Sequence, residues 1–91
     1  MTNEIHCAHI LVKTDKDAQS VLERLRNGEK FANIAGAVSL CPSRKRGGDL
    51  GTFGRGRMVK EFEQAAFALQ KGQISPAVKT KFGYHVIKRL E

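Results

Sequence analysis

The first and last segments of the chain are candidate β-strands, in which successive side chains point to opposite faces. In residues 4–13 one predicted face carries Ile5, Cys7, His9 and Leu11, and the other carries His6, Ala8, Ile10 and Val12. Both faces are partly apolar, so we expect this strand to lie in the centre of a sheet that is covered on both sides. Residues 84–90 alternate in the same way and predict a last strand with His85 and Ile87 on one face.

Between these two strands, apolar residues recur with helical spacing in three segments. The first helix is predicted to begin at Thr14 or Asp15, either of which can cap it, and to end with the Asn-Gly pair at residues 27–28. A second helix is predicted for about residues 31–38 and a third for residues 59–69.

The remaining segments supply two short extended stretches. Residues 50–53 predict a short strand, and residues 73–78 predict an extended segment that Ser75-Pro76 interrupts. Because proline cannot donate to a strand ladder, this segment is expected at an edge or a bulge, and a turn over residues 79–83 leads into the last strand. The order β-α-α-β-α-β-β has no regular βαβ rhythm, so it predicts an α+β fold with helices around a small, mainly antiparallel sheet.

Length and composition predict one soluble globular domain over residues 1–91. The chain has 41% hydrophobic and 27% charged residues, and no apolar run approaches the roughly 20 residues of a membrane-spanning helix. The first residues lack the basic and apolar regions of a secretion signal, so we expect a cytoplasmic protein. Two cysteines, Cys7 and Cys41, are too few for a disulfide framework, although a single bridge between them stays open.

The chain carries a net charge of +7, which favours acidic partners such as nucleic acid, an anionic membrane surface or acidic peptides. Basic residues gather in and beside the glycine-rich loop of residues 39–62; they are Arg44, Lys45, Arg46, Arg55, Arg57 and Lys60. Phosphate contacts need only such a cluster, but one tyrosine and five phenylalanines leave few rings to stack on bases. A nucleic-acid-binding module is therefore one hypothesis, and a solvated basic rim explains the cluster equally well.

Histidines and cysteines are the candidate reactive side chains. A single histidine in an apolar strand is most often a core residue, but His9 and His85 would meet if their strands were neighbours with matched faces. A metal site is disfavoured because alternation directs His6 away from His9. A Cys41 nucleophile is disfavoured because Pro42 removes a backbone donor. The loop glycines fit neither the P-loop nor the dinucleotide fingerprint, so we expect no metal and no cofactor.

Four blocks of sequence carry a family resemblance. They are A-H-I-L-V-K at residues 8–13, S-L-C-P-S-x-K-R-G-G-D-L-G-x-F at 39–53, G-x-M-V-x-x-F-x-x-A-x-F at 56–67 and F-G-Y-H-V-I-K at 82–88. Together they resemble a parvulin-type peptidyl-prolyl cis/trans isomerase of the small single-domain prokaryotic kind, in order and over nearly the whole chain. The resemblance implies a parvulin/FKBP-like fold in which three to four helices surround a four-stranded antiparallel sheet.

The resemblance also implies the polar part of an active site. His9 and His85 would be the paired histidines beneath the site, and Thr80 would belong to their hydrogen-bond network. Cys41 would stand at a position where family members have Cys or Asp, which suggests a polar role rather than covalent attack.

An apolar pocket for the proline ring is the second part of the implied site. Leu50, Met58 and Phe62 match it by their position in the motifs. Further contacts at the rim are expected from Arg44, Lys45, Arg46, Val59 and Phe82.

The predicted function is rotation about X-Pro bonds in protein clients, by a monomeric folding helper. The barrier of about 20 kcal/mol comes from amide resonance, so a catalyst need only bind the twisted amide better than either planar form. The connection over residues 13–17 is short and partly acidic, so dependence on phospho-Ser/Thr is not expected, and acidic or apolar residues before proline are the expected preferences. The alternative is a basic module on the same fold that binds nucleic acid or another acidic partner.

Overall fold

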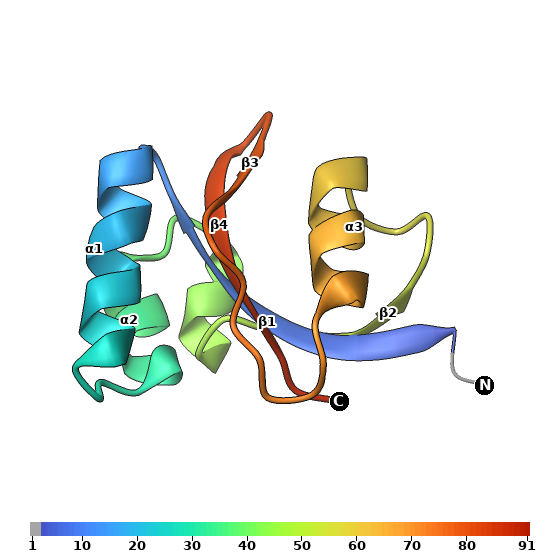
Figure 1. Cartoon of the computed structure of the whole chain (residues 1–91), viewed down its shortest axis with the longest axis horizontal. Coiled ribbons are helices and arrows are strands. Elements are labelled where there is room, and N and C mark those ends of the chain that lie inside the picture. The colour runs from blue at the N-terminus through green and yellow to red at the C-terminus, as the bar shows by residue number, and fades with distance from the viewer. Residues whose placement is uncertain (1–2) are drawn as a thin grey trace.

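A four-stranded antiparallel sheet forms the centre of the computed structural model, which describes residues 3–91 (Figure 1). Along the chain the elements are β1 (Glu4–Val12), α1 (Asp15–Arg26), α2 (Phe31–Val38), a 3-10 helix η1 (Pro42–Arg46), β2 (Asp49–Gly54), α3 (Lys60–Ala68), β3 (Val78–Thr80) and β4 (Gly83–Arg89). The strands lie in the order β2-β1-β4-β3. The α+β class and the predicted order of strands and helices are confirmed, and η1 is an addition to them.

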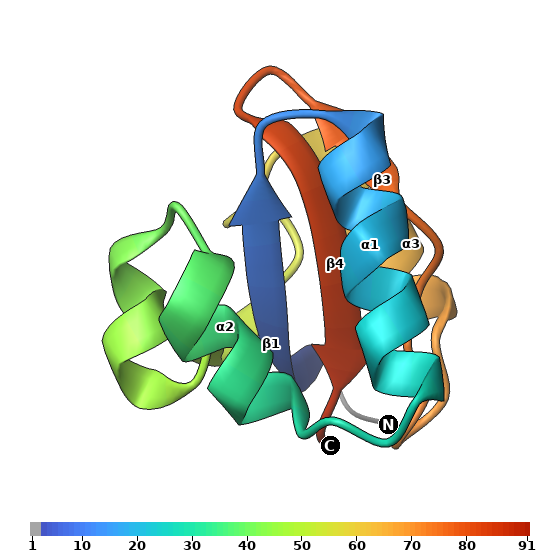
Figure 2. The ribbon, with the colours of Figure 1, turned by 90° about the vertical axis from the view of Figure 1, so that its left-hand side faces the viewer.

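Helices cover both faces of the sheet, so each face has its own apolar core. Helices α1 and α2 lie in front of β1 and β4 in Figure 2, and the core beneath them includes Ile10, Ile34 and Val86. Helix α3 covers the opposite face, where Phe62 and Cys7 belong to the second core (Figure 1). Strand β1 is paired on both sides, with β2 and β4. Its central position, predicted from its two apolar faces, is confirmed.

The ends of the first helix follow the predicted capping residues. The Thr14 side-chain oxygen accepts a hydrogen bond from the Asp17 backbone N–H at 3.1 Å, and Gly28 follows the helix with a φ of 94°. Helix α3 is slightly shorter than predicted, because Val59 keeps an extended backbone and the helix begins at Lys60. Within residues 3–91, no helix is both long enough and apolar enough to cross a membrane.

The turn before the last strand is tighter than predicted, which corrects the boundaries given as residues 79–83. Residues Val78–Thr80 form β3, so only Lys81 and Phe82 remain in the turn. Gly83 allows this close approach, because its φ is 138° and a Cβ there would lie 2.5 Å from a carbonyl oxygen of β1.

The segment predicted as extended over residues 73–78 is bonded to β4 without forming a full strand. Ile74 makes an isolated bridge to β4. The Ser75 backbone N–H donates to the Ile87 carbonyl at 2.8 Å, and the Ser75 hydroxyl accepts from the Ile87 N–H at 3.0 Å. Pro76 lies outside the ladder, as expected for a residue without a backbone donor.

Candidate active site

Strands β1 and β4 bring two histidines from opposite ends of the sequence into contact. In the antiparallel register Leu11 faces His85 and His9 faces Ile87, so the two histidine side chains lie diagonally on one face of the sheet. The two Nδ1 atoms are 3.0 Å apart, and the rings are stacked with 5.1 Å between their centroids. Both side chains are buried. Such a bond needs one protonated and one unprotonated nitrogen, so the tautomers of the two rings are coupled.

The hydrogen-bond network continues from His85 to Thr80. The Thr80 side-chain oxygen lies 2.7 Å from His85 Nε2, and it also accepts a hydrogen bond from the Phe82 backbone N–H at 3.1 Å. At the other end, His9 Nε2 is buried and has no hydrogen-bond partner among the described residues. Among the residues that the structure describes, the network therefore ends at a buried ring nitrogen that is left without a partner.

Burial keeps the histidine pair uncharged at neutral pH. Burial and, to a smaller extent, the neighbouring His85 lower the pKa of His9 from 6.5 to about 4. Burial likewise lowers the pKa of His85 from 6.5 to about 4. Two neutral imidazoles can pass a change of hydrogen-bond direction along the network, but at pH 7 they do not supply a positive charge.

A hollow of about 460 Å³ lies directly beside this histidine pair. Its lining residues are His9, Leu11, Leu40, Cys41, Pro42, Leu50, Arg57, Met58, Val59, Phe62, Phe82 and His85. All three residues predicted for the proline pocket are among them, and they come from β2, from the segment before α3, and from α3 itself. The Phe62 ring stands edge-on to both histidine rings, with centroid distances of 5.5 Å and 5.2 Å. The hollow is therefore bounded on this side by the contact of one buried phenylalanine ring with two neutral imidazoles.

Cys41 lines the same hollow, and a buried serine fixes its backbone. The Ser39 hydroxyl accepts hydrogen bonds from the Leu11 N–H at 3.1 Å and from the Cys41 N–H at 3.3 Å. Cys41 is a free, partly exposed thiol, and Cys7 is a free thiol buried in the second core. Sequence reasoning gave Ser39 no role, because nothing local marks a serine after a helix as buried.

The basic loop is placed differently from the predicted rim. Val59 and Phe82 do line the hollow, and Phe82 is 59% exposed. Residues 44–46 lie instead on η1, which packs against α2; Pro42 at the start of η1 lines the hollow, but residues 44–46 do not. The lining includes a different cation, Arg57, which sequence analysis had assigned only to the basic cluster.

The other titratable groups near β1 are engaged in local contacts. His6 Nε2 lies 2.7 Å from the Asp49 carboxylate, and burial raises the pKa of the Cys7 thiol to about 11. Across residues 3–91, no three His, Cys, Asp or Glu side chains are grouped as metal ligands would be.

Comparison with known proteins gives one consistent family. A model of the rotamase, PPIC-type PPIase domain, matches residues 9–91. The foldase protein PrsA of Geobacillus sp. (strain WCH70) is 52% identical over 86 residues, which are 93% of this chain and 31% of that protein. The chain thus spans less than a third of the length of this curated relative.

Solved structures of small archaeal proteins match over their full length. The structure of Pin from the psychrophilic archaeon Cenarcheaum symbiosum has a TM-score of 0.87 and 56% identity, and the match covers 100% of this chain and 95% of that one. The solution structure of NmPin, the parvuline of Nitrosopumilus maritimus, has a TM-score of 0.90 and 47% identity over 100% of this chain and 99% of that one.

Proposed function

The chain belongs to the PPIC-type peptidyl-prolyl isomerase family, the parvulins, and on that premise we propose that it catalyses cis/trans rotation of X-Pro bonds in protein clients. The observation that carries the proposal is an apolar hollow built directly against a buried, uncharged histidine pair. The reported relatives are foldases and parvulins, which favours an isomerase over a basic binding module.

Rotation about an X-Pro bond requires no bond to be broken. The unaided reaction takes tens to hundreds of seconds, because amide resonance opposes the twist. A site that holds the proline ring still and offers polar partners to the rotating carbonyl side binds the twisted amide better than either planar form. Leu50, Met58 and Phe62 supply the apolar wall for the ring.

Cys41 and the histidine pair supply the polar side of the hollow. The twisted amide loses its resonance, so its nitrogen and oxygen both change as hydrogen-bonding groups. His9 is part of the lining, and its buried Nε2 has no partner among the described residues, which supports a role for this ring. Coupling through His85 to the Thr80 hydroxyl lets the His9 ring be either donor or acceptor without taking up a net charge.

The surroundings of the hollow support a preference for apolar or acidic residues before proline. Leu40 and Phe82 are exposed apolar side chains in the lining, and Arg57 is a cation in it. Only Lys13 and Thr14 connect β1 to α1, a short connection that supports independence from phosphorylation. Clients that place a leucine, phenylalanine or glutamate before the proline are accordingly the proposed substrates.

We further propose that the chain acts as a monomer in a reducing compartment such as the cytoplasm. All the residues of the proposed site come from one chain, so no second copy is needed to complete it. Two free thiols, one of them in the proposed site, suit a compartment that keeps cysteines reduced.

Exchange spectroscopy on short X-Pro peptides tests the isomerase directly. We expect a small molar fraction of the protein to accelerate cis/trans exchange, with kcat/KM highest for apolar or acidic residues before proline. Replacing Met58 by alanine removes half-buried apolar contact with the ring, which should lower kcat/KM about tenfold, whereas Met58→Leu should stay close to the wild type. Failure to accelerate any peptide of the panel would rule out the isomerase. Nucleic-acid affinity with a steep salt dependence would then support the basic module.

A further inference from the structure

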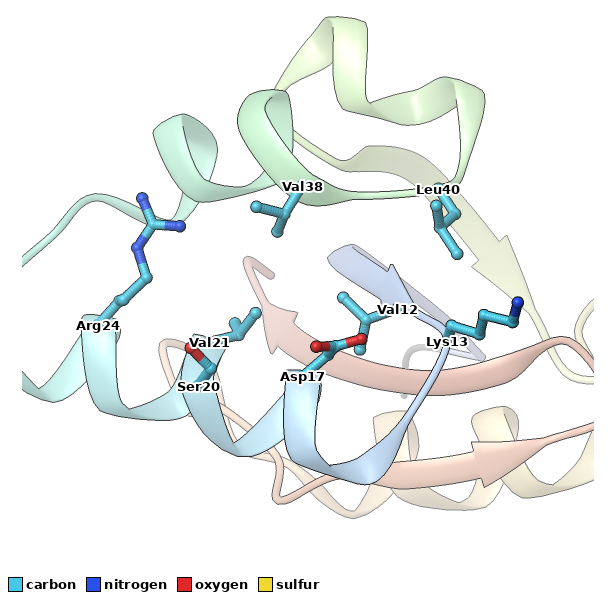
Figure 3. A pocket seen from close by; sticks show the side chains of 8 residues that line it. All are labelled: Val12, Lys13, Asp17, Ser20, Val21, Arg24, Val38 and Leu40. Carbon is cyan, nitrogen blue, oxygen red and sulfur yellow. The ribbon is translucent and has the colours of Figure 1, made fainter.

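A second hollow, of about 310 Å³, lies on the opposite face of β1, between α1 and α2 (Figure 3). Its floor is apolar: Val12 and Val21 are buried and belong to the core beneath α1 and α2, and Val38 packs against that core. Figure 3 shows these side chains and that of Leu40 pointing towards one another across the hollow. The hollow therefore has the form of a site for an apolar side chain.

Charged residues at the edge of this hollow carry both signs. Lys13 and Asp17 are exposed at one end, and Arg24 lines it further along α1. The Arg24 guanidinium is already bonded to Glu29, with Nη2 and Oε1 2.8 Å apart. Because the charges at the edge have both signs and Arg24 is already paired, they favour neither an acidic nor a basic ligand. The apolar floor therefore determines which side chain the hollow binds.

Leu40 connects this hollow to the proposed proline pocket. It lines both hollows and is 61% exposed. Its backbone N–H donates to the Leu11 carbonyl at 2.8 Å, which holds it at the edge of β1. Leu11 lines the proline pocket and Val12, the next residue, lines the second hollow. An extended chain that leaves the pocket over Leu40 is thus led around the edge of the sheet into the second hollow.

We infer that the client residues that precede the proline run over Leu40 and place one apolar side chain in the hollow between α1 and α2. This inference rests on the proposed isomerase function, because the proline itself occupies the pocket on the other face. In the pose proposed above, the ring lies against Met58 and Phe62 and the preceding carbonyl faces the polar wall at Cys41, and all three residues line the same hollow. Leu40 is the neighbour of Cys41 on the side of the second hollow, so the upstream and not the downstream flank reaches it. The substrate class is therefore an extended segment with an apolar residue upstream of its proline.

Kinetics with matched peptides test this second contact. In one series a leucine is moved one position at a time through the upstream flank of a polar peptide, and in a control series through the downstream flank. We expect one upstream position to lower KM about tenfold relative to serine at that position, which corresponds to burial of most of one leucine side chain. The downstream series should show no such position. An equal response in both series would overturn the inference and leave the isomerase itself intact.

A blocking variant assigns the effect to the hollow. Ser20 is an exposed residue of the lining, so Ser20→Phe fills the space without disturbing the core, and Gln19→Phe places the same ring on the same helix outside the lining. Ser20→Phe should keep the wild-type kcat/KM on short peptides, which also shows that it folds, and should lose the advantage of the upstream leucine. Gln19→Phe should retain that advantage. Persistence of the advantage in Ser20→Phe would contradict the inference.

Fluorescence separates failure of this inference from failure of the isomerase proposal. The chain contains no tryptophan, so a tryptophan at the favoured upstream position of a peptide reports only its own surroundings. We expect its emission to shift to the blue on binding to the wild type, and the leucine peptide to compete the shift at about a tenfold lower concentration than its serine counterpart. A blue shift without accelerated cis/trans exchange would support binding in the second hollow and would reject the isomerase proposal. No shift would reject the hollow, whatever the kinetics show.

Discussion

Two uncharged histidines determine what the proposed site can do. His9 and His85 would repel each other if both were protonated, and both are removed from water. The arrangement that forms the hydrogen-bond network, two buried imidazole rings in contact, is therefore also the cause of their lowered pKa values. At the scale of single residues, the site thus contains a hydrogen-bond network of two histidines and a threonine, and the burial of this network keeps the histidines uncharged.

The histidine pair predicts a specific loss of stability in mild acid. In the unfolded chain both rings take up protons as the pH falls below about 6.5, whereas in the folded chain they stay neutral until about pH 4. Between these pH values the unfolded state therefore binds more protons than the folded state. The contribution of the neutral histidine pair to the free energy of unfolding is complete above about pH 6.5 and is lost as the pH falls towards 4. A plot of the free energy of unfolding against pH should have a maximal slope of about 1.4 kcal/mol per pH unit for each histidine.

Urea unfolding at a series of pH values measures this slope. Replacing His9 and His85 together by asparagine should flatten the dependence of the unfolding free energy between about pH 6.5 and 5.5, above the range in which carboxylates take up protons. His6→Gln, outside the pair, is the matched control and should retain the slope. A double variant with the wild-type slope would show that the pair is not the group that titrates.

Cys41 provides a residue-scale test of mechanism. If it contributes a polar wall, Cys41→Asp should keep kcat/KM within about tenfold of the wild type, because the carboxylate supplies an acceptor at the same place. Cys41→Ala should lose more activity, because it supplies no polar group at all. A covalent mechanism would lose all activity in both variants, and exchange spectroscopy with one X-Pro peptide distinguishes the outcomes.

At the scale of elements, the site depends on how the connection from α2 to β2 folds back. Pro42 is at the start of η1, and Gly47 and Gly48, with φ of 68° and 86°, turn the chain into β2. The His9 N–H donates to the Gly48 carbonyl at 2.9 Å. This connection thereby joins the backbone of a site histidine to the strand that carries Leu50.

Two glycines of this connection give a matched prediction. A Cβ at Gly48 would collide with the His9 carbonyl oxygen, whereas at Gly51, with a similar φ of 73°, nothing lies within 4 Å. Gly51→Ala should therefore cost about 1–2 kcal/mol of unfolding free energy, the strain of a left-handed backbone alone. Gly48→Ala should cost clearly more and should also lower kcat/KM, because His9 must move. Equal unfolding free energies for the two variants would contradict the steric argument.

The elements also show where sequence patterns were sufficient. The period of two in residues 4–13 and 84–90 predicted the faces of β1 and β4, because successive side chains of a strand point to opposite faces of the sheet. No periodicity marks η1, so the placement of residues 44–46 outside the lining of the pocket could not be predicted. The tight turn after β3 depends on a close approach of Gly83 to β1, a long-range contact that a local pattern does not contain. Arg57 and Leu40 were missed as lining residues for the same reason.

At the scale of the whole molecule, a net charge of +7 surrounds a site whose histidines are neutral. If the chain is the proposed isomerase, we expect the charge to act on the approach of clients rather than on the rotation of the bond. Attraction between a basic protein and an acidic client raises the rate of encounter and is screened by salt, with a Debye length of about 10 Å at 0.1 M ionic strength. Rotation within the pocket involves no change of net charge and should be insensitive to salt.

A salt series with paired peptides tests this separation. For a peptide with glutamate before the proline, kcat/KM should fall about fivefold between low and high salt while kcat stays constant, and the glutamine counterpart should change little. Arg57 lies in the lining and Arg44 on η1 outside it, so Arg57→Gln should remove more of the salt response than Arg44→Gln, although each variant loses one charge. If the two variants lose the same fraction of the salt response of kcat/KM, the attraction comes from the overall charge of the protein and does not depend on the position of Arg57. If the glutamate and glutamine peptides respond alike, the positive charge does not act on clients, and the proposed preference for acidic residues before proline is wrong.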